Sequence, residues 1–362
     1  MSIRTKLRQF DKKRRQKSRQ LEGWLLKQLA RFSDIETALV NHDEVKRILV
    51  VRTNKRIGNM LFLIPFLRQV KASYPQAEVD LLLSTPWQVK LLAGLGISNC
   101  YHAPLDRRGI PTLLRNLKAM RQRRYDLLLM PYSSSTDTFL SAFIHARNKM
   151  ARAFGERHQV FQHSITPPPR RCHAAMASLV LLPGQPQQAD HHLALTEIER
   201  DNAQQAATAL RAEGKKTLAF FRGARGEKQL SDDYWQTLLS QVEQNSDAAI
   251  QWVEILSPDI AAPLRADTQT YQCADFRQLG ATLAALDGFI CCDTGPLHLA
   301  DAAGARCYGL FSHTDPLIFG CIGKHCLNLA VDEQAGYAIA QDLNEQLTDS
   351  ARHLQGSAAV SA

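Results

Sequence analysis

The chain of 362 residues lacks several features that define other classes of protein. No apolar run approaches the roughly 20 residues that span a bilayer, and no hydrophobic signal segment stands at the N-terminus. The eight cysteines include no CxxC pair, which argues against a zinc site and favours reduced core thiols. No GxxxxGK[ST] sequence is present, which excludes a Walker A loop. We therefore expect a globular protein of two domains that stays in the cytoplasm.

Excess positive charge is also absent from most of the chain. Residues 1–31 hold eleven Lys or Arg and two acids, and the remainder holds 33 of each sign, so the net charge of +9 belongs to this arm. The arm begins RTKLRQFDKKRRQKSR and continues LEGWLLKQLARF, which on a helix places four apolar side chains on one face: Leu21, Trp24, Leu25 and Leu29. This pattern is typical of a peripheral membrane anchor at an anionic inner leaflet. The alternatives are a helix packed on its own domain and, least favoured, a nucleic-acid contact.

Short β-like runs alternate with helical runs along the rest of the chain, which favours parallel sheets with crossover helices. Proline clusters at 167–169 and 183–186 interrupt the pattern and divide the chain near residue 190. Strands are expected at 47–52, 78–83, 126–130, 217–221, 249–256, 288–292 and 307–311, and helices at 60–73, 192–214 and 297–303. The fold class is therefore α/β, with two Rossmann-like, doubly wound domains at 45–190 and 191–346. A basic helical extension covers 1–44 and a flexible tail 347–362.

Residues 288–316, GFICCDTGPLHLADAAGARCYGLFSHTDP, crowd reactive groups into two turns. Asp293, Thr294 and Gly295 stand between an apolar strand and a helix of small residues that ends at Gly304. Open α/β sheets bind ligands at the carboxyl ends of their strands, and helix N-termini attract phosphate. His298 lies in the first turn of that helix. A second turn, at 312–316, should open beside the first.

This segment resembles the DTGPxHL signature, with its following LFGPTDP-like turn, of the ADP-heptose:lipopolysaccharide heptosyltransferases, glycosyltransferase family 9. Residues 46–83, KRILVVRTNKRIGNMLFLIPFLRQVKASYPQAEVDLLL, resemble the opening strand, glycine loop, helix and second strand of the same family. The resemblance covers roughly residues 46–346. It implies a GT-B fold whose two domains face each other across a cleft, with the nucleotide-sugar donor on the C-terminal domain and the acceptor on the N-terminal one.

The resemblance also implies roles for individual donor-site residues. Thr294 and Gly295 meet the diphosphate, Asp293 the sugar hydroxyls, and His298 donates to phosphate. Lys228 follows a glycine-rich loop and precedes a helix whose N-cap is Ser231, which matches the family's phosphate-binding lysine.

Three further residues of the C-terminal domain are candidates for the donor site. Arg222 or Arg225 are alternatives to Lys228 as phosphate ligands. Glu254 ends a strand, where it either holds the donor ribose or adenine or is an ordinary strand-end acid.

The N-terminal glycine loop departs from the family. Related heptosyltransferases use an aspartate directly after the loop glycine as the base, whereas Asn59 follows Gly58 here, and an amide cannot accept that proton. Asn59 then orients the acceptor, and the base is Asp137, Asp106 or a water held by Asp293. The competing interpretation makes Asp137 a helix N-cap. A further possibility is that departure of the diphosphate dominates the barrier.

Beside this loop, Lys55 and Arg56 precede the glycine, and with Gly58 they are expected to bind the phosphorylated acceptor.

These residues predict an inverting transferase that moves heptose from ADP-heptose to the lipopolysaccharide inner core at the cytoplasmic membrane face. No Asp-x-Asp motif is present, so we expect no metal and no cofactor. The alternatives are a degenerate family member that binds nucleotide sugar or core glycolipid without transfer, and another GT-B enzyme such as an epimerase.

Overall fold

The computed structural model describes residues 38–152, 160–161, 163–165, 172–184, 190–260, 262–266 and 268–360, together with 21, 23–25 and 28, and side chains as far as residue 348. The basic run at 1–20 and Leu29 lie outside this set. The chain divides into two compact units, Met1–Arg170 with Ala174–His191, and Arg171–His173 with His192–Ala362. No helix within the described ranges is both long enough and apolar enough to cross a bilayer.

The first unit is built on a sheet of six parallel strands in the order β3-β2-β1-β4-β5-β6. The strands are β1 (Arg47–Val51), β2 (Glu78–Leu83), β3 (Asn99–His102), β4 (Tyr125–Met130), β5 (Ala146–Ala151) and β6 (His163–Ser164). The helices are α2 (Ile57–Leu61), α3 (Ile64–Ser73), α4 (Trp87–Leu91), α5 (Ile110–Arg123) and α6 (Ser135–Ala142). Short 3-10 helices cover His42–Glu44 and Leu179–Leu181.

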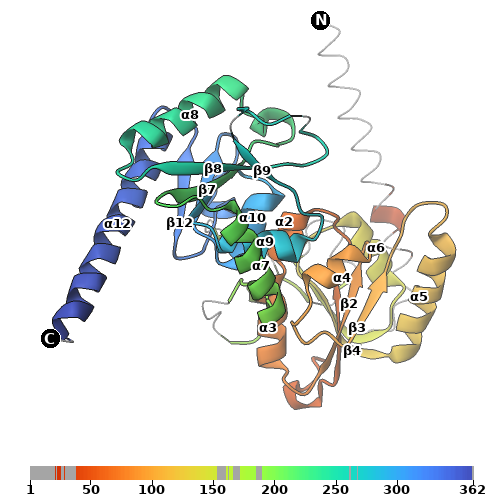
Figure 1. Cartoon of the computed structure of the whole chain (residues 1–362). Helices are drawn as coiled ribbons and strands as arrows, with labels where there is room; N and C mark the ends of the chain where they lie inside the picture. The colour runs from red at the N-terminus through yellow and green to blue at the C-terminus, as the bar shows by residue number, and fades with distance from the viewer. Residues whose placement is uncertain are drawn as a thin grey trace, which may run out of the picture. The chain divides into compact units, whose positions relative to one another are not determined.

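The second unit has a six-stranded parallel sheet in the order β12-β11-β10-β7-β8-β9. Its strands are β7 (Lys216–Phe221), β8 (Ile250–Ile255), β9 (Gln269–Tyr271), β10 (Gly288–Cys292), β11 (Cys307–Phe311) and β12 (Cys326–Ala330). Its helices are α7 (Glu197–Leu210), α8 (Asp232–Asn245), α9 (Phe276–Ala284), α10 (Gly295–Ala303), α11 (Pro316–Phe319) and α12 (Ala335–Val360), with a 3-10 turn at Gly226–Lys228. The packed pair α8 and α12 lies beside this sheet (Figure 1). The helical backbone of α12 extends over most of the segment 347–362, for which the sequence predicts a flexible tail.

Both sheets follow the same winding. Counted from the first strand of each unit, the spatial order is 3-2-1-4-5-6, which confirms the prediction of two Rossmann-like, doubly wound domains. The winding reverses between β1 and β4 in the first unit and between β7 and β10 in the second. The loops that leave these four strands therefore meet at the topological switch points, where such sheets bind ligands.

The predicted helix 60–73 is in fact two helices, α2 and α3. Pro65 lies in the first turn of α3 and has no N–H to donate to the carbonyl of Leu61, so the continuous hydrogen-bond ladder is interrupted there. The break allows the short α2, which carries the glycine loop residues Gly58 and Asn59, to follow β1 closely.

Five strands escaped prediction because their sequences do not follow a simple apolar pattern: β3, β5, β6, β9 and β12. In β5, ARNKMA, the buried positions include Asn148 and Lys149. The ammonium group of Lys149 donates to the Ser141 carbonyl over 2.8 Å, which satisfies one of its donors in the interior.

An ion pair joins α7 to α9 in the second unit. Arg277 donates from Nε to Glu199 over 2.5 Å and from Nη2 to the Ala194 carbonyl over 2.6 Å. Glu199 also closes a capping box with Thr196. The hydrogen bond from Arg277 lowers the pKa of Glu199 from 4.5 to about 2.

This pair predicts a specific dependence of stability on pH. Because the pKa of Glu199 is lower in the folded chain, its stabilisation is complete above about pH 4.5 and declines as the pH falls toward 2. The difference in unfolding free energy between wild type and Glu199→Gln should therefore shrink between about pH 5 and pH 2 in urea titrations. Glu197→Gln, an exposed acid on the same helix, is the control for the loss of a carboxylate from the first turn. A constant difference for Glu199→Gln would contradict the assignment.

Candidate active site

Asp293 follows β10 at the switch point of the second unit and collects hydrogen bonds from three elements. Its Oδ2 accepts from Lys228 Nζ and, over 2.6 Å, from Thr314 Oγ1, while Oδ1 lies 3.1 Å from His298 Nε2. Burial alone would raise the pKa of this carboxyl, but the hydrogen bonds from His298, Lys228 and Thr314 outweigh burial and hold the pKa well below its ordinary value. Asp293 is therefore a carboxylate at neutral pH and organises the cluster.

Lys228 reaches Asp293 from the opposite side of the switch point. It ends the 3-10 turn after β7, and its ammonium also donates to the Asp293 carbonyl over 3.1 Å. Ser231 caps the following α8 by accepting from the Tyr234 N–H, as predicted. The Lys228 side chain is 32% exposed, and two of its three ammonium protons point to Asp293, so the third can meet an anionic ligand.

The N-terminus of α10 starts immediately after Asp293. Thr294 occupies the N-cap position without capping the helix through its side chain, and its hydroxyl lies 3.2 Å from Cys291 Sγ. Gly295 begins the helix, and the buried His298 points from its first turns to Asp293. Gly304 ends α10 in the left-handed conformation at φ 89°, as the sequence predicts. The helix dipole therefore places partial positive charge beside the Asp293 cluster.

Thr314 is a site residue that the sequence did not single out. It lies in the turn between β11 and α11, and its hydrogen bond to Asp293 confirms that the two polar turns open side by side. In the same turn His313 contacts only its neighbour Ser312 among the hydrogen bonds of the described residues, so it stays outside the cluster.

Glu254 is fully buried at the end of β8, and both of its oxygens accept from the protein. Arg222 Nε donates to Oε1 over 2.6 Å and Leu264 N donates to Oε2 over 2.6 Å. Arg222 also binds Asp232 and the Ala262 carbonyl, so it links the loop after β7 to the loop after β8. Arg222 thus has a structural partner on each side, whereas Arg225 is exposed.

Glu254→Gln should lower the unfolding free energy by about 1–3 kcal/mol, because the amide keeps only one of the two buried oxygens that accept from Arg222 and from the Leu264 N–H, so one of these donors loses its acceptor. Urea unfolding measures the change. Glu227→Gln, an exposed acid in the same loop, is the matched control and should shift stability by less than about 0.5 kcal/mol. Equal stabilities for the two variants would show that the hydrogen bonds of Glu254 with Arg222 and Leu264 do not stabilise the fold.

The first unit repeats the arrangement at its own switch point, with an acid from the first turn of α6, the helix that follows β4. Asp137 Oδ1 accepts from the Thr53 N–H over 3.0 Å and from the Thr53 hydroxyl, which ties the segment after β4 to the loop after β1. The N-cap of α6 is Ser134, whose hydroxyl accepts from the Asp137 N–H, so the interpretation of Asp137 as the N-cap is wrong. Asp137 is the third helical residue because the chain enters the helix earlier than predicted.

Asp137 is wholly buried beside a buried cation. Burial raises the pKa of its carboxyl, although the hydrogen bonds from Thr53 and the charge of Arg52 oppose this shift, and Oδ2 has no hydrogen-bond partner among the described residues. Arg52 is 6% exposed and its guanidinium lies 4.4 Å above the Tyr132 ring. Because Asp137 has no access to solvent, its side chain is placed to hold the loop after β1 in position.

The predicted acceptor-binding residues lie on the same loop. Lys55 and Arg56 are exposed, and Gly58 and Asn59 are partly exposed on α2. The Asn59 side chain makes no hydrogen bond to the described part of the protein, so its amide is available to a ligand. Gln88 in α4 also holds this loop, because its amide donates to the Asn54 carbonyl over 2.5 Å.

Asp106, another candidate base, accepts from the Gly109 N–H over 2.8 Å just before α5. This bond gives Asp106 a local role in the turn that starts the helix.

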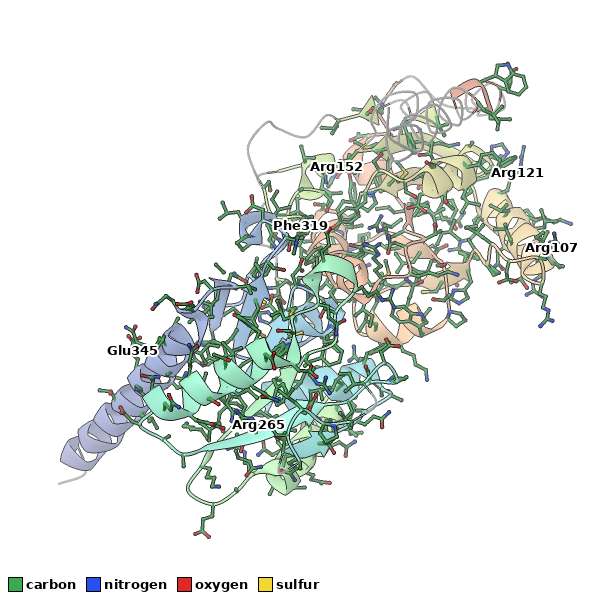
Figure 2. The ribbon with its side chains drawn as sticks, turned by 90° about the horizontal axis from the view of Figure 1, so that it is seen from above. Arg107, Arg121, Arg152, Arg265, Phe319 and Glu345 are labelled. Atoms are coloured by element: carbon green, nitrogen blue, oxygen red, sulfur yellow. The ribbon has the colours of Figure 1, made fainter. Side chains whose placement is uncertain are left out.

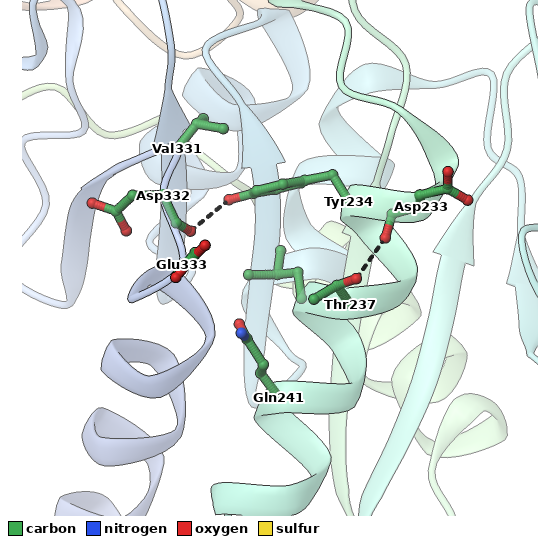
Figure 3. Close-up of a pocket in the computed structure, with 8 residues that line it drawn as sticks. Asp233, Tyr234, Thr237, Gln241, Val331, Asp332 and Glu333 are labelled. Atoms are coloured by element: carbon green, nitrogen blue, oxygen red, sulfur yellow. Dashed lines mark hydrogen bonds between the residues drawn. The ribbon is translucent and has the colours of Figure 1, made fainter.

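A separate cavity of about 330 Å³ opens between α8 and the segment that joins β12 to α12 (Figure 3). Tyr234 crosses it and donates to the Asp332 carbonyl over 3.4 Å. None of the predicted site residues lines this cavity.

Two parallel sheets of the 3-2-1-4-5-6 order, each with polar groups at its switch point, match the GT-B fold of solved heptosyltransferases. Residues 113–347 match the sequence model of glycosyltransferase family 9 (heptosyltransferase), and the chain belongs to this family. The search of curated proteins found no match.

Solved structures share this fold at low sequence identity. A family 9 glycosyl transferase from Veillonella parvula has a TM-score of 0.69 and 14% identity, over 81% of this chain and 88% of that chain. E. coli ADP-heptose lipopolysaccharide heptosyltransferase II has a TM-score of 0.65 and 15% identity, over 84% and 99%. E. coli heptosyltransferase WaaC with ADP has a TM-score of 0.63 and 16% identity, over 83% and 99%.

Proposed function

We propose that the protein transfers heptose from ADP-heptose to the inner core of lipopolysaccharide, with inversion at the anomeric carbon. The observation that carries this proposal is the contact between Lys228 and Asp293 across the switch point of the second unit. It places a cation, a carboxylate and a helix N-terminus together, which suits a sugar diphosphate. The identity of the donor draws further support from the similar E. coli heptosyltransferase solved with ADP.

In this mechanism the acceptor hydroxyl attacks the anomeric carbon as the bond from that carbon to the diphosphate breaks, and the hydroxyl proton passes to a water molecule. Lys228 and the start of α10 stabilise the negative charge that grows on the departing ADP. Asp293 holds Lys228 in place. It also accepts hydrogen bonds from the sugar hydroxyls, which replace its contact with Thr314. Thr294, Gly295 and His298 complete the diphosphate site, and Glu254 supports the loop that faces the nucleoside.

The acceptor side has an amide where a base is expected. Asn59 orients the acceptor hydroxyl, while Lys55 and Arg56 bind phosphate groups of the core. Because Asp137 is buried and Asp106 caps a turn, we assign most of the rate acceleration to departure of the diphosphate.

Asn59→Asp tests this assignment directly. A carboxylate at this position adds a general base, and we expect kcat to rise about tenfold or more with little change in KM for the donor. Asn59→Gln, which keeps the amide on a side chain one methylene longer, is the control and should not gain rate. A wild type that binds ADP-heptose without transfer, next to an active Asn59→Asp, would identify the degenerate, non-catalytic alternative instead.

Docking at the cytoplasmic face of the inner membrane is part of the proposal, with no nucleic-acid partner. In the arm, Leu21 and Trp24 are 59% and 58% exposed. On α5, Ile110 and Leu114 are exposed on one face, whereas Leu113 and Leu117 pack on the core.

Basic side chains accompany this exposed face of α5. Arg107 and Arg121 lie at the outer edge of the first unit (Figure 2). Apolar side chains flanked by cations suit an anionic lipid surface. Vesicles containing phosphatidylglycerol should retain the wild type and lose the Leu114→Glu variant, and equal binding of both would exclude α5 from docking.

The cellular experiment is the mass of the core oligosaccharide from cells that lack the gene. We expect loss of a heptose-containing portion, restored by the wild-type gene but not by Asp293→Ala. An unchanged core in the deletion strain would remove the lipopolysaccharide assignment.

A further inference from the structure

Three cysteines meet at the amino ends of β11 and β12, at the opposite end of β11 from the turn that holds Thr314. Cys307 and Cys326 begin the two strands and are register partners, and Cys321 comes from the loop between them. The three sulfur atoms all lie within 4.8 Å of one another. Cys307 is 0% exposed and Cys321 is 7% exposed, so the cluster is largely withdrawn from solvent.

The backbone around the cluster is held in place. Asn328 Oδ1 accepts from the Cys321 N–H over 2.8 Å, and its amide donates to the Cys321 carbonyl over 2.9 Å. On α10, the buried Asp301 accepts from the N–H groups of Ile322 and Gly323 over 3.0 and 2.9 Å. The loop that presents Cys321 is thus fixed at both ends.

Asp301 also reaches the cluster itself. Its Oδ1 lies 3.3 Å from Cys326 Sγ. Gly323 is required for this approach, because a Cβ there would lie 2.5 Å from Asp301 Oδ1 and 3.2 Å from Cys326 Sγ.

We propose that Cys307, Cys321 and Cys326 bind one zinc ion, and that Asp301, whose Oδ1 lies 3.3 Å from Cys326 Sγ, turns toward the ion as the fourth ligand. Tetrahedral zinc with Zn–S bonds of about 2.3 Å separates its sulfurs by about 3.8 Å, so only small side-chain movements are needed. Each thiol that binds releases its proton, and zinc changes no oxidation state. This proposal reverses the expectation from the cysteine spacing, because Cys321 and Cys326 are not spaced as CxxC and Cys307 comes from another strand.

The site has a structural role in this proposal. Zinc would join the last turn of α10 to β11 and β12, while the other end of α10 carries the Asp293 cluster. The zinc site therefore stabilises the C-terminal end of the helix that carries the donor site at its N-terminus. It takes no part in the transfer itself.

Zinc content of the full-length protein tests the proposal. The protein is purified under reducing conditions, loaded with zinc and dialysed; we expect one zinc per chain, and intense cobalt(II)–thiolate absorption when cobalt replaces zinc. Both signals should be lost in the Cys321→Ser/Cys326→Ser double variant and kept in Cys273→Ser, a cysteine outside the cluster. Asp301→Asn should bind zinc about 10- to 100-fold more weakly.

Thermal unfolding supplies a second measurement. Zinc should raise the Tm of the wild type and of Cys273→Ser but not that of the double variant. Retention of zinc by the double variant, or no zinc or cobalt binding by the reduced wild type, would overturn the proposal. A disulfide within the cluster that takes up no zinc after reduction would overturn it as well.

Discussion

Asp293→Ala is expected to lower kcat/KM for ADP-heptose by about 10²–10³-fold, the cost typical of losing a preorganised electrostatic group. Without the carboxylate, Lys228 and Thr314 lose the oxygen that holds them together, and His298 loses its partner. The measurement is the steady-state rate of ADP release with a heptose-deficient core acceptor.

Two controls separate the role of Asp293 from general damage to the turn. Asp293→Asn keeps one acceptor oxygen and should lose less activity than Asp293→Ala. Asp315→Asn retains the cap of α11 in the adjacent turn and should stay within about threefold of wild type. If Asp293→Ala were also within threefold of wild type, the donor site would have to lie elsewhere.

Asp137→Ala is expected to cost about 2–4 kcal/mol of unfolding free energy, since it leaves the Thr53 N–H and hydroxyl without their acceptor and removes the negative charge that favours the buried Arg52 cation. Urea unfolding, with hydrogen exchange followed on peptides of the first unit, measures this loss. Thr136→Ala, one residue earlier on α6, is the control and should change stability little.

The kinetics of Asp137→Asn distinguish positioning from proton transfer. Asparagine keeps an oxygen for Thr53, so a positioning residue predicts kcat within about tenfold of wild type at a temperature where the variant is folded. A fall of 10²–10⁴-fold without unfolding would make Asp137 the general base.

The β10–α10 segment was predictable from local sequence alone. An apolar run gives the strand β10, the polar turn starts α10, and Gly304 ends the helix, and each of these signals lies within a few residues of its effect. The meeting of Lys228 with Asp293 follows from the winding of the sheet, which the alternation of elements already implies.

Contacts made by distant and polar segments were not predictable in the same way. The hydrogen bond of Thr314, the clamp between Arg222 and Glu254, and the cysteine cluster all depend on packing between elements. Strand β12 alternates partly buried Leu327 and Leu329 with exposed Asn328 and Ala330, but five residues are too short a signal to predict the pairing that brings Cys326 to Cys307.

The most direct test of the proposed activity mixes the purified protein with ADP-heptose and a heptose-deficient lipopolysaccharide core. The mass of the acceptor, determined by mass spectrometry, and the amount of released ADP are measured in the same reaction. We predict an acceptor that gains one heptose for every ADP released, with the product linkage inverted relative to the donor. ADP-heptose that binds but yields neither product nor ADP would contradict a transferase.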